Sequence, residues 1–370
     1  MRIGLNLLYL LPGVVGGTET YAAELLRGLD RAGGDHEFEV FVNRESAEWP
    51  IPAAPRFRRV ICPVTAVNRG RRYLFEQFRL PGLLKRRSID VVHSLGYVGP
   101  LRTPCPAVVT VPDLNYLALK ASLPKGKRMV LRMFSTTAAR RAREVITISR
   151  FSKDSICGEL NIPSQKVSVI YLGPRTATAA PLPSREAEAL RRAYGLDRPY
   201  LSAIGGGAVH KNIVRLVKVF GVVNVSGSYV LGLIGHLPRE AKCEAKKRDD
   251  VVVTGFVPDG HLLALMSGAA AFVMPSLYEG FGLPVLEAQQ AGVPVICSAA
   301  ASLPEVAGEG AEYFDPYSVP DMAEKIAMVL SSEAVREDLR RKGRANLQRF
   351  SWDRAARETL DVYGRAMALP

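Results

Sequence analysis

Short apolar segments alternate with amphipathic helical patterns along almost the whole chain, and this alternation restricts the fold more than any other feature. Apolar runs bounded by turn residues are typical of strands buried on both faces, which belong to parallel sheets covered by the intervening helices. The expected strands form a first series at 2–10, 37–43, 58–64, 90–96, 107–113, 144–149 and 166–173, and a second at 200–206, 229–235, 251–257, 270–276, 294–298 and 311–315. The sequence therefore predicts an α/β protein with two Rossmann-like domains, each built on a parallel sheet.

The chain changes character between the two series. Residues 173–190 are rich in proline and alanine and at first show no apolar period, which is typical of a connection between domains. A chain of 370 residues also exceeds the size at which a single hydrophobic core usually stops growing. We therefore expect an N-terminal domain over 1–173, a linker over 174–195, a C-terminal domain over 196–350 and a final amphipathic helix over 351–370.

Composition argues against several classes of protein. Hydrophobic residues make up 48% of the chain and charged residues 23%, as in ordinary globular domains. No apolar run reaches the roughly 18 residues that a membrane-spanning helix needs, and the apolar start is short enough to favour a first strand over a signal peptide. The five cysteines are scattered without a C-x-x-C pair, and the five histidines lack metal-ligand spacing. We expect a reducing compartment, no disulfide framework and no metal site.

Positive charge is concentrated in the first part of the chain. Residues 1–173 contain 26 lysine and arginine residues against 14 acidic ones, so they carry nearly all of the net charge of +13. The stretches 69–87 and 125–143 interleave basic with apolar residues. The commoner interpretation is that these stretches form amphipathic helices, with the basic face in solvent and the apolar face against the core. The alternative is an anionic membrane surface, with the protein cytoplasmic and peripheral at the inner membrane face. Nucleic acid is disfavoured because no recognised binding motif accompanies the charge.

Two carboxylates bracket a glycine-rich turn, from Glu279 to Glu287, directly after the expected strand at 270–276. Ligands of open α/β sheets bind at the carboxyl ends of strands. Pro284 suits the first turn of a following helix, and the exposed N–H groups at the start of that helix would bind an anion such as a diphosphate. One carboxylate could then take a ribose diol and the other a sugar diol. The alternative is that Glu287 merely caps the helix while Glu279 is a solvated loop residue.

The context of these carboxylates is specific. The segment 275–318 closely resembles the donor-site region of retaining glycosyltransferases of family 4, which have the GT-B fold. Further segments match the family in the same order and extend the resemblance to essentially the whole chain: 16–21, 146–156, 169–173, 205–212, 251–266 and 350–363. The resemblance implies two Rossmann-like domains that face each other across a cleft, with the final helix crossing back to the first domain.

The resemblance assigns donor-binding roles in the second domain. Glu287 would hold the ribose hydroxyls, Glu279 would hold the donor sugar, and Lys211 would neutralise the leaving diphosphate. Since lysine and helix dipoles supply the positive charge, no metal ion or other cofactor is expected. The leaving phosphate would take the acceptor proton on the same face of the sugar, so that configuration is retained. The expected donor-binding residues of this domain are Lys211, Val257, Glu279, Phe281, Gly282, Leu283 and Glu287, with Val257 near the base.

In the first domain, Gly16 and Gly17 would let the backbone approach the donor phosphates. His93 and Tyr97 are candidate acceptor-binding residues, although a hydrogen-bonded structural role is equally expected for His93. Asp113 ends a strand and matches a family position that faces the sugar. The candidate catalytic residues are Glu279, Lys211 and Asp113.

Two positions depart from the family pattern. His210 stands where the family usually has arginine, which removes one permanent positive charge from the phosphate site. Pro112 stands where many relatives have a histidine that bonds the outer hydroxyl of the donor hexose, which raises the possibility of a donor without that hydroxyl.

Ser302 and Glu305 form a capping-box pattern, to which we assign a structural role.

The leading functional hypothesis is a hexosyltransferase that moves mannose from GDP-mannose to a lipid-linked or cell-surface glycan. A transferase for a soluble acceptor, such as a natural product or storage sugar, is the second hypothesis, and the basic first half argues against it. The third is an inactive scaffold or partner protein, against which the retention of both carboxylates and Lys211 argues. A nucleotide-sugar epimerase with a similar fold is a minor further option.

Overall fold

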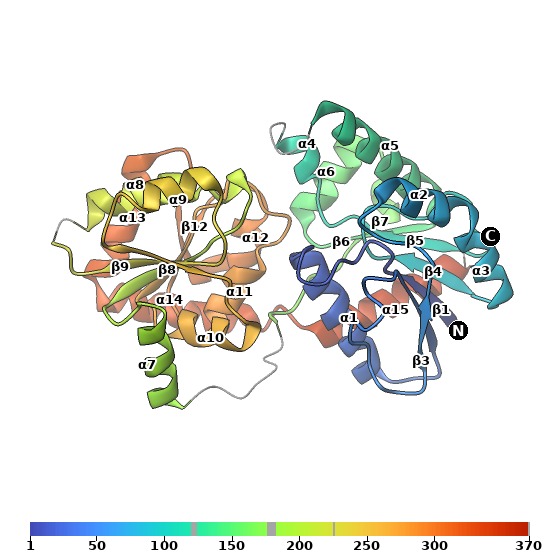
Figure 1. Cartoon of the computed structure of the whole chain (residues 1–370), viewed down its shortest axis with the longest axis horizontal. Coiled ribbons are helices and arrows are strands. Elements are labelled where there is room, and N and C mark those ends of the chain that lie inside the picture. Colours follow the sequence, from blue (N-terminus) through green and yellow to red (C-terminus); the bar gives the residue numbers. More distant parts are fainter. Residues whose placement is uncertain (120–123, 176–182, 225, 369–370) are drawn as a thin grey trace. The chain divides into compact units, whose positions relative to one another are not determined.

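The computed structural model describes residues 1–119, 124–175, 183–224 and 226–368. The chain forms two compact units, the first comprising Met1–Gly173 with Ser351–Pro370 and the second Pro174–Phe350. Each unit is a parallel sheet with helices on its faces (Figure 1). The predicted fold class, two Rossmann-like α/β domains with parallel sheets, is confirmed.

The sheet of the first unit has the strand order β3-β2-β1-β4-β5-β6-β7. β1 pairs with β2 on one side and with β4 on the other, where Leu5 lies opposite His93. The strand order therefore reverses at β1, and the carboxyl ends of β1 and β4 form the kind of edge at which such sheets bind ligands. The strands are β1 (Arg2–Asn6), β2 (Glu37–Val42), β3 (Phe57–Ile61), β4 (Val91–Ser94), β5 (Ala107–Thr110), β6 (Glu144–Thr147) and β7 (Val167–Val169).

Helices cover this sheet and bury its apolar side chains. The last helix of the chain, α15, packs against α1, and a Cβ atom at Gly28 of α1 would lie only 2.8 Å from the carbonyl oxygen of Trp352. Glycine at this position therefore permits the close approach of the two helices. The helices of this unit are α1 (Gly17–Ala32), α2 (Arg69–Phe78), α3 (Leu80–Arg86), α4 (Asn115–Ala118), α5 (Lys125–Arg141), α6 (Arg150–Leu160) and α15 (Trp352–Ala368).

The sheet of the second unit has the order β10-β9-β8-β11-β12-β13. Side chains from α8, α9 and α13 fill the core on one face, and those from α10, α11 and α12 fill the core on the other. The strands are β8 (Tyr200–Ile204), β9 (Val230–Ile234), β10 (Val251–Gly255), β11 (Ala271–Met274), β12 (Val295–Ser298) and β13 (Ala311–Phe314). The helices are α7 (Ser184–Ala193), α8 (Ile213–Val223), α9 (Arg239–Ala245), α10 (Asp259–Ser267), α11 (Leu283–Gln290), α12 (Leu303–Ala307), α13 (Val319–Ser331) and α14 (Glu333–Leu347).

The segment expected to be a linker is partly ordered into the second unit. Residues 184–193 form α7, which packs against α10, and Leu190 and Tyr194 contact the core beneath it. The expectation of a linker over the whole of 174–195 was therefore wrong for this part, because a short amphipathic helix follows the prolines. The central part of the expected linker, 176–182, lies outside the described residues.

Candidate active site

The turn between β11 and α11 is held in one conformation by local packing. Gly282 precedes the helix with φ of 103°, a conformation that is costly for residues with a side chain. A Cβ atom there would also lie 2.7 Å from Cδ2 of Leu303. Phe281 is buried, and its ring packs edge-on against Phe350 with the ring centroids 5.8 Å apart. These contacts fix the direction of the amino end of α11, and the amino end of a helix favours an anion.

Ser302 supports this turn from the neighbouring loop. Its buried hydroxyl lies 2.8 Å from the carbonyl oxygen of Glu279 and 3.0 Å from that of Phe281. The predicted capping box was wrong, because the hydroxyl makes no cap bond to α12 and is used by the turn instead. Sequence reasoning missed Ser302 as a residue that positions the site, and the only available signal was its place after the next parallel strand.

Lys211 and Glu279, two of the predicted catalytic residues, form an ion pair. Nζ of Lys211 donates to Oε1 of Glu279 at 2.8 Å, and the two side chains are 20% and 13% exposed. The stem of Lys211 lies along Gly206, where a Cβ atom would be 3.3 Å from its Cγ. The pair therefore joins residues 68 positions apart and places a cation beside a carboxylate in the turn that leads into α11.

Backbone contacts hold the loop of Lys211 against the same turn. The N–H of Leu277 donates to the carbonyl oxygen of His210 at 2.8 Å. Asn212 has a left-handed conformation, with φ of 58°, and its side-chain amide donates to the carbonyl oxygens of Pro275 at 3.1 Å and Pro316 at 3.0 Å. Because three loops at the carboxyl ends of the strands are joined in this way, the position of Lys211 does not depend on its own flexible stem alone.

Glu287 lies in α11 and is almost fully buried, with 7% of its side chain exposed. Nε of Arg175 donates to its Oε1 at 3.2 Å. A carboxylate removed from water needs such a partner. Glu287 is therefore neither a solvated acid nor a simple cap, and sequence reasoning, which placed Arg175 in a linker, did not anticipate its partner.

His210 lies beside the ion pair of Lys211 and Glu279. Burial lowers the pKa of its imidazole, Lys211 lowers it further, and Glu279 acts in the opposite direction. His210 is therefore neutral near pH 7 in the empty site. The positive charge that arginine would supply at this position is absent until a proton is added.

Together these residues form a site with two carboxylates, two cations and a helix amino end. Carboxylates accept hydrogen bonds from hydroxyl groups, whereas lysine, arginine and helix N–H groups bind phosphate. Val257 lies in the loop between β10 and α10 and packs against the core of the same unit. The arrangement suits a ligand that combines hydroxyl groups with a diphosphate.

The glycine loop of the first unit is open. Gly16 has φ of 58° and directly precedes α1, whose first residue is Gly17. Both glycines are exposed, and a Cβ atom at either would have no neighbour within 4 Å. The backbone at the amino end of α1 is therefore accessible to a ligand, as the predicted phosphate contact requires.

The structure gives His93 the hydrogen-bonded arrangement of the structural role that the sequence allowed beside acceptor binding. His93 is fully buried, with Nδ1 2.7 Å from the hydroxyl of Tyr363 and Nε2 2.7 Å from Oγ1 of Thr110. Burial lowers the pKa of His93 to about 3, so the ring is neutral and one nitrogen donates while the other accepts. His93 joins α15 to the sheet and has no free atom for an acceptor.

Tyr97 and Asp113, in contrast, are brought together. The hydroxyl of Tyr97 donates to Oδ1 of Asp113 at 2.8 Å, and the N–H of Asn115 donates to the same oxygen at 3.0 Å. Both side chains are partly exposed at the carboxyl ends of β4 and β5. Pro112 is buried, and its carbonyl oxygen accepts a bond from Thr147 at 3.4 Å. Its ring therefore serves the packing of this segment.

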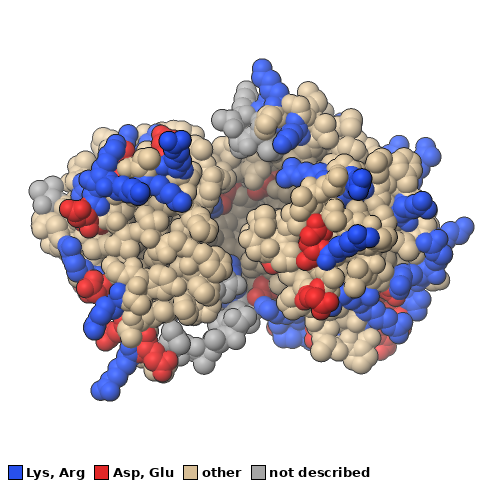
Figure 2. Space-filling view, in the orientation of Figure 1, with Lys and Arg blue, Asp and Glu red and all other residues tan. Residues whose placement is uncertain are grey.

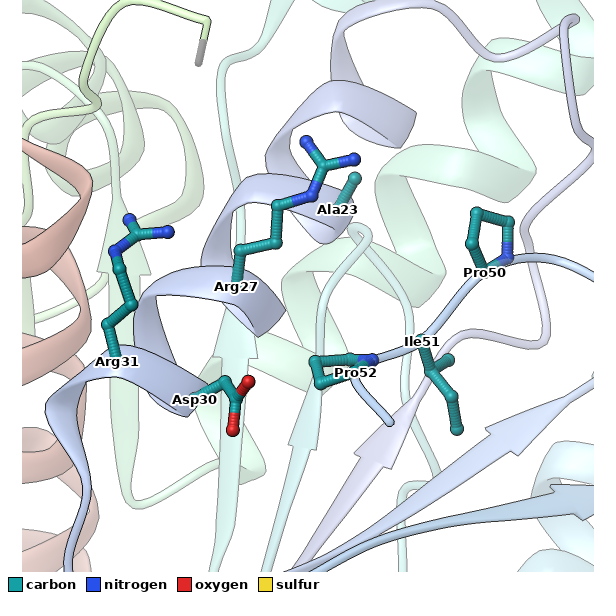
Figure 3. Close-up of a pocket in the computed structure, with 7 residues that line it drawn as sticks. All are labelled: Ala23, Arg27, Asp30, Arg31, Pro50, Ile51 and Pro52. Carbon is teal, nitrogen blue, oxygen red and sulfur yellow. The ribbon is translucent and has the colours of Figure 1, made fainter. Parts of the chain in front are cut away.

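A shallow pocket of about 220 Å³ lies elsewhere on the first unit, between α1 and the loop at 50–52 (Figure 3). Arg27 and Arg31 extend from α1 on one side, and Pro50 and Pro52 form the other. Arg27 pairs with Glu24 and Arg31 with Asp353, so both cations already have carboxylate partners. We assign no function to this pocket.

Comparison with known families matches both halves of the chain. The profile described as Glycosyltransferase Family 4 matches residues 15–177, and the profile described as Glycosyl transferases group 1 matches residues 187–346. The chain belongs to glycosyltransferase family 4. It is a nucleotide-sugar-dependent glycosyltransferase, and its two parallel-sheet units are those of the GT-B fold.

Related proteins agree with this assignment. The O-antigen chain mannosyltransferase B of Escherichia coli is 29% identical to this glycosyltransferase over 265 residues, which cover 70% of each chain. Sucrose-phosphate synthase from Thermosynechococcus elongatus has a similar structure, with a TM-score of 0.82 at 20% identity over 100% of this chain and 99% of the other. HepE from Anabaena, solved in complex with UDP-glucose, has a TM-score of 0.72 at 15% identity over 98% and 99% of the two chains. At such identities the structural similarities show the fold alone.

The described residues of the glycosyltransferase contain neither a candidate metal site nor a helix that could span a membrane. No group of three or more histidine, cysteine, aspartate or glutamate side chains has a geometry that could hold a metal ion. Among the helices of the same residues, none combines the length and the apolar character that crossing a membrane requires.

Proposed function

We propose that this enzyme transfers a hexose to a lipid-linked or cell-surface glycan with retention of configuration, and that GDP-mannose is its leading donor. The observation that carries the proposal is the ion pair of Lys211 and Glu279 in the turn that leads into α11. The pair supports the proposal because a cation that could bind a diphosphate lies beside a carboxylate that could accept hydrogen bonds from sugar hydroxyls. The choice of mannose and of a glycan acceptor is supported by the Escherichia coli relative, whose name is O-antigen chain mannosyltransferase B.

In the proposed reaction, the diphosphate lies at the amino end of α11, with Lys211 and the N–H groups at 281–283 around it. The bond between the anomeric carbon and the phosphate oxygen breaks while a bond to the acceptor oxygen forms. The acceptor proton passes to the departing phosphate oxygen on the same face of the sugar. Glu279 would hold the sugar and Glu287 the ribose, while Val257 lies near the base. Gly16 and Gly17 would approach the phosphates, and Tyr97 and Asp113 would face the reacting sugar.

Turnover of a panel of nucleotide sugars tests the proposal. We expect the purified protein to consume GDP-mannose faster than GDP-fucose, UDP-glucose or UDP-galactose. With a glycan acceptor, NMR of the product should show the anomeric configuration of the donor. Preference for another nucleotide sugar would overturn the choice of mannose. Failure to turn over any of them would favour the scaffold hypothesis.

The outer faces of α2 and α5 support docking on an anionic membrane surface. Leu74 and Phe78 of α2 are 60% and 76% exposed, and Met129 and Met133 of α5 are 67% and 56% exposed. The rings of Tyr73 and Phe134 stack with centroids 4.9 Å apart, so the two helices lie side by side. Figure 2 shows lysine and arginine side chains spread over the visible surface of the same unit. Apolar side chains among basic ones suit the headgroup region of an anionic bilayer.

The arginines at the end of α5 are not suitable probes of this surface. Arg140 donates to the carbonyl oxygen of Leu160 at 3.2 Å, and Arg141 donates to that of Leu101 at 3.1 Å. Arg143 buries one of its Nη atoms. Neutralising these three residues would disturb the fold as well as the charge, whereas the apolar side chains on the outer faces are exposed.

Replacing Leu74 and Phe78 together by serine should weaken binding to phosphatidylglycerol-containing vesicles by about tenfold or more. The reason is that the variant loses apolar area buried in the membrane, worth up to about 1.5–3 kcal/mol for each side chain. Vesicle sedimentation at low and physiological salt measures the effect. Val222→Ser, which changes a 61% exposed valine of the second unit, is the matched control. If the wild-type protein does not bind anionic vesicles even at low salt, the membrane proposal is wrong and a soluble acceptor is favoured.

Donor affinity should depend on pH through His210. The imidazole is neutral in the empty site, and a bound diphosphate stabilises its protonated form, so binding takes up a proton. Affinity for GDP-mannose should therefore rise as pH falls from 8 towards 6, and the rise reaches about tenfold for each unit by which binding raises the pKa of His210 only below the pKa of the free imidazole. Calorimetry over this range measures the change. His210→Arg should bind with little pH dependence, and equal slopes for the two proteins would exclude His210 as the cause.

A further inference from the structure

Each of the two donor-site carboxylates is paired with its own cation. Glu279 is bonded to Lys211, and Glu287 is bonded to Arg175. The carboxylate of the second pair is the more buried of the two, since the Glu287 side chain is 7% exposed and the Glu279 side chain is 13% exposed. The Arg175 side chain is 28% exposed. Arg175 follows Pro174 at the beginning of the second unit, and its partner lies 112 positions later in the chain. Nothing in the family resemblance assigns a role to this arginine.

The geometry of the second pair suits orientation of the carboxylate. A carboxylate has two oxygens with about four acceptor positions, and an arginine presents five N–H donors in a rigid planar fork. The contact from Nε of Arg175 to Oε1 of Glu287 at 3.2 Å therefore fixes the orientation of one oxygen of the group. The guanidinium also compensates the charge of a carboxylate that is removed from water, and a carboxylate accepts hydrogen bonds from hydroxyl groups such as those of a ribose diol.

We infer that Arg175 is a positioning residue for the donor nucleotide, because it holds the carboxylate of Glu287 in place for the 2′- and 3′-hydroxyls of the ribose. The inference rests on the proposed function of this site. It extends the donor site to Arg175 at the beginning of the second unit, and it makes recognition of the ribose depend on a residue that acts through the carboxylate of Glu287.

Comparison of each ribonucleotide with an analogue that lacks the ribose hydroxyls tests the inference. Affinities of GDP and UDP, each with its 2′,3′-dideoxy analogue, are measured by calorimetry on the wild-type protein and on Arg175→Ala. We expect the variant to bind the ribonucleotide about tenfold more weakly, as expected for loss of an oriented charge-assisted hydrogen bond. It should bind the dideoxy analogue as the wild-type protein does. Arg175→Lys, which keeps the charge without the fork, should recover part of the loss.

Arg341→Ala is the matched control, because Arg341 also pairs with a carboxylate, Asp338, but both are exposed. Equal weakening of the ribonucleotide and the dideoxy analogue in Arg175→Ala would overturn the inference, since Arg175 would then act on the phosphates or on the fold. Unchanged or tighter ribonucleotide binding would also overturn it while leaving the proposed function intact. If the wild-type protein binds neither GDP nor UDP, the proposed donor site itself is wrong, and the inference fails with it.

Discussion

Lys211→Ala should lower turnover by roughly two to three orders of magnitude, the loss seen when one preorganised charge-stabilising donor is removed from an active site. Negative charge on the diphosphate grows as the sugar leaves, so the contribution of Lys211 should be larger in the transition state than in the ground state. The ion pair with Glu279 at 2.8 Å holds the ammonium group beside the turn that leads into α11, where the proposed donor would develop that charge. Steady-state kinetics with the preferred donor measure the effect on kcat and KM separately.

Lys218→Ala is the control for this variant, since Lys218 is an exposed lysine on the neighbouring helix α8. It should leave both constants close to their wild-type values. A Lys211→Ala enzyme with a raised KM and a normal kcat would contradict the proposed role, because the lysine would then bind the ground state and the transition state equally.

Glu287→Ala should weaken binding of the preferred nucleoside diphosphate by about a hundredfold, or about 3 kcal/mol. This is the expected loss when two charge-assisted hydrogen bonds to the ribose are removed. The variant also removes the partner of Arg175, so Glu287→Gln, which keeps the size of the side chain, is measured beside it. Calorimetric titration gives both affinities.

Glu324→Ala, at an exposed position on α13, should bind the nucleotide normally and controls for a general loss of negative charge. An unchanged affinity of Glu287→Ala would show that the carboxylate serves only the stability of its helix and of the Arg175 pair. The role of Arg175 would then lose its basis as well.

The strands could be predicted because they are buried on both faces and therefore read as continuous apolar runs. β1 and β11 lie inside the segments expected from the sequence, with Ile3, Leu5, Phe272 and Val273 fully buried. The family resemblance and the fold class followed from this order of elements and from the motifs around Glu279 and Glu287. Both are confirmed, whereas the roles of individual site residues remain predictions.

Contacts between distant parts of the chain could not be predicted. His93 lies near the end of β4, and a structural role was one of its two expected roles, but its partner Tyr363 lies 270 positions away in the final helix, so the contact itself could not be predicted from local sequence. Arg175 stands in a stretch rich in proline and alanine, and its bond to Glu287 exists only in the folded unit. Ser302 has the spacing of a helix cap, yet the turn before α11 offers its hydroxyl two carbonyl oxygens instead.

A crystal structure of the protein with the preferred nucleoside diphosphate tests the central claim most directly, which is that the donor site is formed by the loops of Lys211, Glu279 and Glu287 in the second unit. The account predicts the diphosphate at the amino end of α11 beside Lys211, with the ribose hydroxyls within hydrogen-bond distance of Glu287. A nucleotide bound away from α11, or bound there with the Glu287 carboxylate touching no part of the ribose, would contradict it.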